Sequence, residues 1–152
     1  MEPKRFEDRP AHKVVGLEYR IKIATADWQD LWSNKFMPRM EDINTAGEGH
    51  PCMGYYFGTD IPGTVDFLMG KPARDGAPVA EGLTVRNVPA AAYAVFECDL
   101  KSIGQQWGLI YGEWLPRSGW VIDEAAPGCE AFGPGTMEGD EPVLIYLPVK
   151  QP

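Results

Sequence analysis

The chain is short of basic residues and has no long apolar run. Its 152 residues contain 14 Lys and Arg against 22 Asp and Glu, a net charge of −8. A strongly acidic protein repels the phosphate backbone, which argues against direct nucleic-acid binding. The longest uncharged, mostly apolar run covers residues 88–96, far too few to cross a membrane. The sequence therefore predicts neither a nucleic-acid-binding nor a membrane protein.

Cysteine is also scarce, with Cys52, Cys98 and Cys129 only. An odd count at wide spacings argues against a disulfide framework and is typical of a reducing compartment. No pair has the spacing of a structural zinc site. The first residues are polar and contain no apolar signal core. We expect a cytoplasmic protein that needs no metal or cofactor.

Familiar catalytic motifs are absent as well. The sequence has no glycine-rich phosphate loop followed by Lys and Ser or Thr, and no nucleophile elbow. What it does have is aromatic residues, namely 5 Trp, 6 Tyr and 6 Phe. Its hydrophobic content of 44 % is ordinary for a folded protein. We expect one domain spanning residues 1–152, with binding favoured over catalysis.

One amphipathic helix is predicted directly after residues 25–27, which offer capping oxygens. Its apolar stripe repeats at intervals of three and four residues and consists of Trp28, Leu31, Trp32 and Phe36. We expect Pro38 either to end this helix or to kink it, with Met40 and Ile43 continuing the helix after the break. For Trp28, Leu31 and Phe36 the favoured role is core packing.

A second helix is predicted over residues 100–115, with Asp99 or Ser102 at its start and Pro116 and Gly119 at its end. Its stripe has the same helical spacing and consists of Ile103, Trp107, Ile110, Tyr111, Trp114 and Leu115. Trp107 and Tyr111 lie one turn apart on this helix. If the apolar stripe contacts both the sheet and a cleft, these two side chains are exposed to the cleft.

Strand patterns surround both helices. They cover residues 14–21, 52–58, 65–69, 83–88, 91–97, 128–132 and 143–149. The order strand, helix, strand, strand thus occurs twice, which indicates an internal duplication with halves at about 11–71 and 83–150. The predicted fold is α+β, with pseudo-two-fold symmetry and two helices packed on a largely antiparallel sheet.

This arrangement resembles the gyrase-inhibitor-like effector-binding domain, found alone and fused to DNA-binding domains in AraC-type and multidrug-responsive MerR-type regulators. The resemblance extends from about residue 11 to residue 150. The stretches that carry it are 12–17, 31–32, 67–70, 88–96, 111–120 and the glutamate strand 129–132. The family often has Tyr in place of Phe132 and an aromatic residue in place of Cys129.

The resemblance implies a cleft between the two halves that accepts bulky, often aromatic and cationic compounds, with Glu130 at its base. Some standalone family members resemble hydrolases of strained natural products, and others resemble inhibitors of DNA gyrase. A hydrolase would use Glu130 as the general base on a bound water. We expect a standalone small-molecule binding module, with these two activities as alternatives and no protein partner named.

Strand parity gives Glu130 independent support. Alternate side chains of a strand face the same way, so Glu130 shares its face with Phe132. A buried carboxylate needs a donor, a proton or a cation, and aromatic faces attract cations. Tyr93 lies beside small alanines, which suggests a crevice. The candidate ligand-binding residues are Glu130, Trp107, Tyr111, Tyr93, Phe132, Tyr55, Phe67 and Tyr146, and no catalytic residue is assigned.

Overall fold

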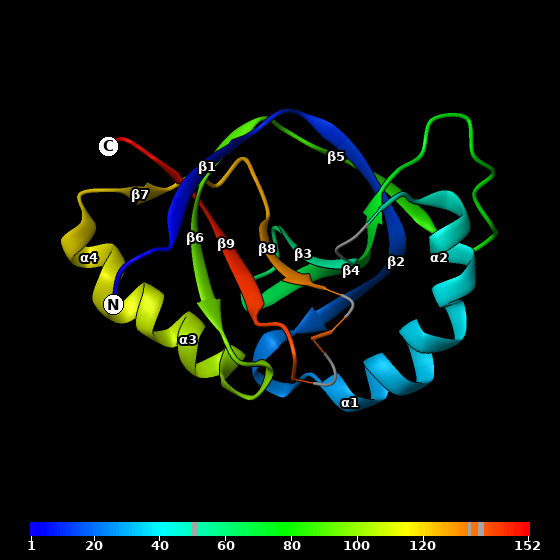
Figure 1. Ribbon diagram of the computed structural model, residues 1–152, viewed down its shortest axis with the longest axis horizontal. Helices are drawn as coiled ribbons and strands as arrows, with labels where there is room; N and C mark the ends of the chain where they lie inside the picture. The colour runs from blue at the N-terminus through cyan, green and yellow to red at the C-terminus, as the bar shows by residue number, and fades with distance from the viewer. Residues whose placement is uncertain (50–51, 134, 137–138) are drawn as a thin grey trace.

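The computed structural model describes residues 1–49, 52–133, 135–136 and 139–152. In this part of the chain, nine strands form one antiparallel sheet in the order β1-β6-β9-β8-β3-β4-β2-β5, and β7 pairs with β9 beside that path (Figure 1). The strands are β1 (Arg5–Arg9), β2 (His12–Lys22), β3 (Cys52–Gly58), β4 (Thr64–Pro72), β5 (Thr84–Val88), β6 (Ala91–Cys98), β7 (Val121–Ile122), β8 (Gly128–Phe132) and β9 (Val143–Lys150).

Two long helical stretches, which we term the first and the second helix, cover one face of this sheet. The first consists of α1 (Trp28–Asp30), η2 (Leu31–Phe36), η3 (Met37–Arg39) and α2 (Met40–Ala46). The second consists of η4 (Leu100–Ser102), α3 (Ile103–Leu109), η5 (Ile110–Trp114) and α4 (Leu115–Ser118). Both contain a wide π-helical segment, η2 and η5, at the middle of the stretch.

Of the two alternatives predicted for Pro38, the structure shows a helix that changes its winding there and continues. Pro38 does not end the first helix, because it lies in the first turn of the tighter segment η3, where a proline ring is tolerated. The chain continues helically to Ala46. The second helix stops at Gly119, as expected, since this residue adopts a left-handed conformation with φ of 80°.

The predicted α+β duplication is confirmed by the topology. The order β2, first helix, β3, β4 recurs as β6, second helix, β8, β9. The same interval along the chain separates Pro10 from Pro89, Trp28 from Trp107 and Leu31 from Ile110. β1 extends the second half by pairing with β6, and β5 extends the first half by pairing with β2. The outer strand of each half therefore comes from the chain that precedes the other half.

The two halves meet where β3 pairs with β8. A single row of paired residues crosses the six central strands there, in the order Leu17, Met69, Gly54, Glu130, Ile145, Phe96. Leu17 and Phe96 are separated by the same interval as the two helical tryptophans. The row thus follows the pseudo-two-fold symmetry of the fold, and Gly54 and Glu130 occupy corresponding positions at its centre.

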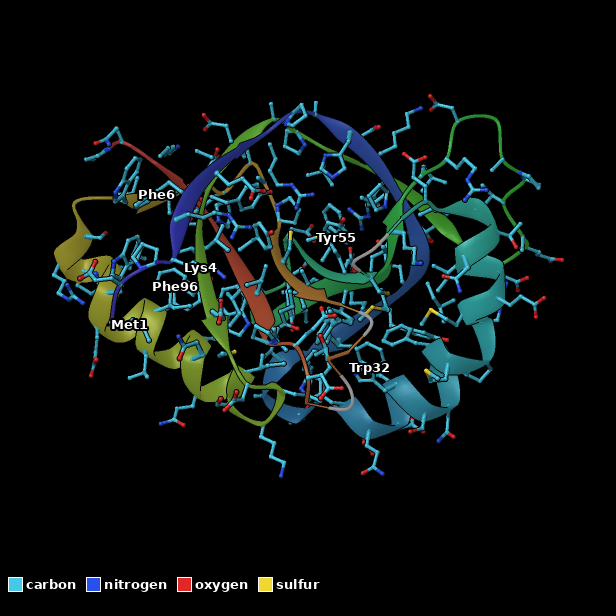
Figure 2. All side chains as sticks on the ribbon, viewed as in Figure 1. Met1, Lys4, Phe6, Trp32, Tyr55 and Phe96 are labelled. Carbon is cyan, nitrogen blue, oxygen red and sulfur yellow. The ribbon has the colours of Figure 1, made fainter. Side chains whose placement is uncertain are left out.

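The sheet is curved, and each face buries a different set of side chains. Under the first helix lies a cluster around Phe36, and under the second lies one around Trp114. The other face is filled by a third cluster that contains Tyr55, Tyr93 and Tyr146. Figure 2 shows Trp32 beside the first helix and Tyr55 on the side enclosed by β1 and β5. Of the helices that the structure describes, none is long and apolar enough to cross a membrane.

Candidate functional site

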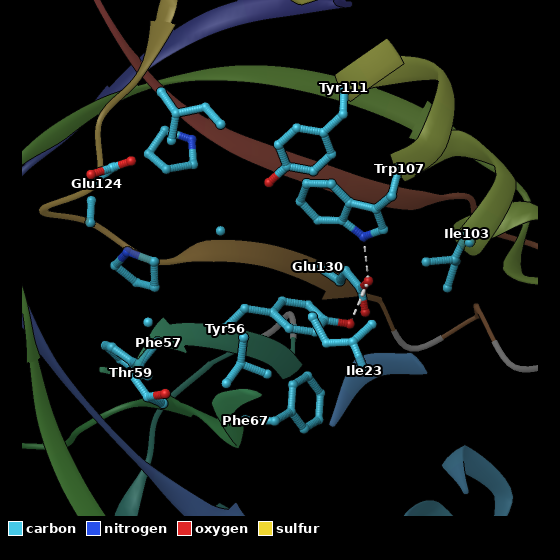
Figure 3. Close-up of a pocket in the computed structure, with 18 of the residues that line it drawn as sticks. Ile23, Tyr56, Phe57, Thr59, Phe67, Ile103, Trp107, Tyr111, Glu124 and Glu130 are labelled. Atoms are coloured by element: carbon cyan, nitrogen blue, oxygen red, sulfur yellow. Dashed lines mark hydrogen bonds between the residues drawn. The ribbon is translucent and has the colours of Figure 1, made fainter. Parts of the chain in front are cut away.

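A cavity of about 1370 Å³ lies between the two helices and the centre of the sheet. Trp28 and Trp32 reach it from the first helix, and Trp107 and Tyr111 reach it from the second. Figure 3 shows Glu130 projecting from β8 into this space, close to Trp107 and to Tyr56 of β3. The site therefore draws on both halves of the molecule and on both helices.

Glu130 is buried, with 4 % of its surface exposed. It accepts hydrogen bonds from the Tyr56 hydroxyl at 2.8 Å and from the Trp107 indole nitrogen Nε1 at 2.7 Å. Both bonds end on Oε2, so Oε1 has no donor among the residues that the structure describes. The strand parity expected from the sequence holds, because Phe132 is also buried and lines the same cavity.

The Glu130 carboxylate accepts from neutral donors and has no ion-pair partner among the residues that the structure describes. Within the described residues, no Lys, Arg or His lies within 4 Å of its carboxylate. Burial raises the pKa of Glu130 above its ordinary value, and the hydrogen bonds from Trp107 and Tyr56 offset part of that rise. An ionised carboxylate in such surroundings is costly unless a positive charge joins it. The site is thus suited to a cation that arrives with a ligand.

Aromatic rings surround the carboxylate at short range. Tyr56 meets Trp107 edge to face at 6.0 Å and meets the Phe67 ring at 4.8 Å. Tyr111 stacks on Trp107 at 5.9 Å with an interplanar angle of 22°, and 47 % of its surface is exposed. Ring faces attract cations by about 0.5–2 kcal/mol each, and more when water is excluded. The walls of the cavity and the carboxylate therefore favour the same kind of ligand.

The eight predicted ligand-binding residues fall into two groups. Five line the cavity: Glu130, Trp107, Tyr111, Phe132 and Phe67. Tyr55, Tyr93 and Tyr146 do not, because strand alternation turns them to the opposite face, where they are buried together. There the Tyr93 hydroxyl donates to the Pro127 carbonyl at 3.3 Å, and the rings of Tyr93 and Tyr146 lie 5.9 Å apart.

Four aromatic residues of the cavity were not among the predicted ones, namely Tyr56, Phe57, Trp28 and Trp32. Tyr55 and Tyr56 are adjacent, so one of them must face the helices, and the sequence does not show which. A signal did exist for Trp28. It occupies the position in the first helix that Trp107 occupies in the second. The prediction nevertheless assigned Trp28 to the core and Trp107 to the cleft, although the two residues are equivalent.

Metal ligation has no support in the described part of the chain, where no group of three His, Cys, Asp or Glu side chains comes together. Cys129 points into the cluster on the opposite face, away from Glu130. Burial raises the pKa of its thiol to about 12, so it stays protonated. The chemistry around Glu130 accordingly rests on its own carboxylate and on aromatic rings.

Comparison with known proteins agrees with this geometry. The family of integron-associated effector binding proteins, Cass2, matches residues 5–149. The chain belongs to this effector-binding family. It is 30 % identical over 151 residues to the transcriptional regulator BrlR of Pseudomonas aeruginosa. The aligned region covers 95 % of this chain and 54 % of BrlR. It is 27 % identical over 109 residues to a DNA gyrase inhibitor of Erwinia billingiae, covering 66 % of this chain and 70 % of that protein.

The fold has solved counterparts. The structure of SAV2435 bound to tetraphenylphosphonium superposes with a TM-score of 0.81 at 17 % identity, over 99 % of this chain and 94 % of that one. The likeness shows that the two chains share a fold. Since the chain spans about half the length of BrlR, it corresponds to only part of that regulator.

Proposed function

We propose that this protein binds bulky aromatic cations in the cavity between its two helices, with Glu130 as the countercharge. The observation that carries the proposal is a buried carboxylate with two neutral hydrogen-bond donors and no cationic side chain among the described residues. A delocalised organic cation loses little hydration on entry and offers flat faces to the surrounding rings. The effector-binding family and the tetraphenylphosphonium complex of SAV2435 support this choice of ligand class.

Titration with tetraphenylphosphonium, followed by calorimetry, tests the proposal. We expect the wild-type protein to bind it and to bind neutral triphenylphosphine oxide far more weakly. Glu130→Gln keeps the size of the side chain and an acceptor for Tyr56 and Trp107, but removes the charge. Removing one partner of a buried charge pair costs about 2–5 kcal/mol. The affinity for the cation should fall at least about 30-fold, while that for the oxide should change little.

Glu113→Gln is the matched control for this experiment. Glu113 is exposed on the second helix and does not line the cavity. Its replacement changes the net charge by the same amount as Glu130→Gln, so any general effect of the acidic surface appears in both variants. Equal loss in both variants, or unchanged affinity in Glu130→Gln, would reject Glu130 as the countercharge.

Hydrolysis is the second candidate, favoured by the raised pKa of Glu130, since such a carboxyl is suited to general base catalysis near neutral pH. It requires the base to reach a water. Oε1, which has no donor among the described residues, is the atom placed to do so, because Oε2 already accepts two hydrogen bonds. Incubation with styrene oxide separates the two functions: diol formation that is lost in Glu130→Gln indicates an enzyme, whereas binding of the cation without product indicates a binding module.

A further inference from the structure

The end of the cavity away from Glu130 has a different chemistry. Figure 3 shows Phe57, Thr59 and Glu124 there, while Glu130, Trp107 and Ile103 lie at the other end. Arg86 of β5 also lines the cavity, and its guanidinium carbon lies 4.5 Å from the centre of the Phe57 ring. The cavity therefore has a carboxylate at one end and a guanidinium at the other.

The Arg86 guanidinium is held in a fixed orientation. Its Nε donates to Glu18 at 2.6 Å and its Nη2 donates to Asp66 at 2.9 Å. Asp66 is 12 % exposed, and hydrogen bonds from Arg20 and then from Arg86 lower the pKa of its carboxyl, so it stays ionised. Two ion pairs and one ring contact leave the planar group little freedom. Its position does not depend on a ligand, which reduces the entropic cost of using it.

Among the described residues, one nitrogen of Arg86 has no acceptor. Nη1 makes no hydrogen bond within the described part of the chain, although Nε and Nη2 both do. The side chain is 31 % exposed at the wall of the cavity. We propose that Arg86 forms a second subsite, in which Nη1 donates hydrogen bonds to a neutral acceptor, such as an ester or amide carbonyl, at the far end of a ligand whose cation lies at Glu130.

Charge at this end determines which acceptor fits. Arg86 and Arg20 face Glu18 and Asp66, so these four charges cancel. Asp60 and Glu124 also line the cavity and add negative charge. A carboxylate at the end of the ligand would be repelled by them, whereas a carbonyl oxygen carries only a partial charge. The inference rests on the proposed binding of cations and adds a preference for elongated cations with a neutral acceptor.

Alkyltriphenylphosphonium cations that end in a methyl ester test this subsite, in a series of chain lengths, against plain alkyl cations of equal length. Both kinds carry the same permanent charge, so their difference reports only the ester. In the wild-type protein we expect one chain length at which the ester binds about fivefold to tenfold more tightly, since a hydrogen bond to a charged group contributes this much or more. The same cation ending in a carboxylate should bind less tightly than the ester.

Arg86→Gln should abolish the preference for the ester over the alkyl cation of equal length. Arg20→Gln is the matched control, because Arg20 binds the same Asp66 but does not line the cavity. It should keep the preference. If Arg86→Gln fails to fold, the ester preference of the wild-type protein is compared with that of Arg86→Lys. This comparison still tests the subsite, because Lys keeps the charge but offers no fixed third nitrogen.

Two results would overturn this inference: equal affinity of ester and alkyl cations at every chain length, or an ester preference that survives in Arg86→Gln. Neither result affects the proposed function, which depends on Glu130 and tetraphenylphosphonium alone. Absence of any tetraphenylphosphonium binding would instead reject the proposed function, and the subsite with it.

Discussion

The two halves of the molecule share a plan and differ at the centre of the site. Each places a helical tryptophan, Trp28 or Trp107, over the row of residues that crosses the sheet. At the centre of that row the first half has Gly54 and the second half has Glu130. Gly54 leaves room for the Phe67 ring, since a β-carbon there would lie 2.8 Å from its Cζ. Duplication thus supplies the aromatic walls, and one difference between equivalent positions supplies the charge.

The largest effect is expected from removing the donor that only one of the equivalent tryptophans provides. Trp107→Phe removes the indole hydrogen bond to Glu130, and hydrogen bonds to charged groups contribute about 1.5–3 kcal/mol. We expect the free energy of unfolding at neutral pH to fall by about that amount. The pKa of Glu130, followed by carboxyl NMR, should rise further, because one of the two bonds that favour its ionised form is lost.

Trp28→Phe is the matched variant in the first half. Trp28 packs edge to face against Phe67 at 5.2 Å, but makes no hydrogen bond to Glu130. It should lose part of its packing and leave the pKa of Glu130 unchanged. The same rise of the pKa in both variants would show that ring burial, and not the indole donor, sets the charge state of the site.

The second effect concerns the missing side chain in the first half. Gly54→Ala should destabilise the protein by about 1–3 kcal/mol, as overpacking of a filled core does, because the new methyl group must displace the Phe67 ring. Urea unfolding measures this. Gly58→Ala, in the same strand, should have almost no effect, because a β-carbon added there would meet nothing within 4 Å. A neutral Gly54→Ala would mean that the ring moves freely and that glycine is not required for space.

The sequence predicted most of the fold, because each half repeats a clear order of apolar patterns. It missed β1, in which four of the five residues Arg5–Arg9 are charged, and β7, which has only two residues. β1 is an outer strand with few buried side chains, so its pairing with β6 leaves no apolar alternation to detect.

The site was predictable only in part. The family resemblance pointed to Glu130, and strand parity tied the orientation of Glu130 to that of Phe132, since both lie on one short strand. Tyr56 required knowledge of which face of β3 meets the helices, and this follows from the pairing of Gly54 with Glu130 across the two halves. Tyr93 was assigned to the cleft because small alanines flank it, and Tyr55 and Tyr146 were assigned without a known strand parity. A curved sheet buries aromatic residues on its other face as well, and all three lie there.

A smaller effect is expected from the charge itself in the free protein. The pKa of Glu130 is raised above its ordinary value of 4.5, so the unfolded chain loses this proton at lower pH than the folded protein does. Glu130 therefore costs no stability below about pH 4.5, and the cost grows as the pH rises through the raised pKa and is constant above it. Donors on Oε2 limit the size of this cost.

Urea unfolding of wild type and Glu130→Gln over a range of pH measures that cost. The two proteins should be close in stability at acid pH, and Glu130→Gln should gain on wild type as the pH rises. Saturating tetraphenylphosphonium should reverse the order at neutral pH, because only the wild type binds it tightly. A difference that does not depend on pH would show that Glu130 is ionised at the same pH in both states.

The smallest effect concerns how each half starts its helix. Asp27 caps the first helix by accepting a hydrogen bond from the backbone nitrogen of Asp30 at 3.0 Å. Neither Asp99 nor Ser102 makes a side-chain cap at the second helix. Asp27→Ala should cost about 1 kcal/mol and Asp27→Asn less, whereas Ser102→Ala should cost a few tenths, as its hydroxyl bonds only the Asp99 carbonyl at an exposed position. Equal losses at Asp27 and Ser102 would contradict the asymmetry. The second helix is then held by its packing around Trp114 and by the hydrogen bond from Trp107 to Glu130, and not by a side-chain cap.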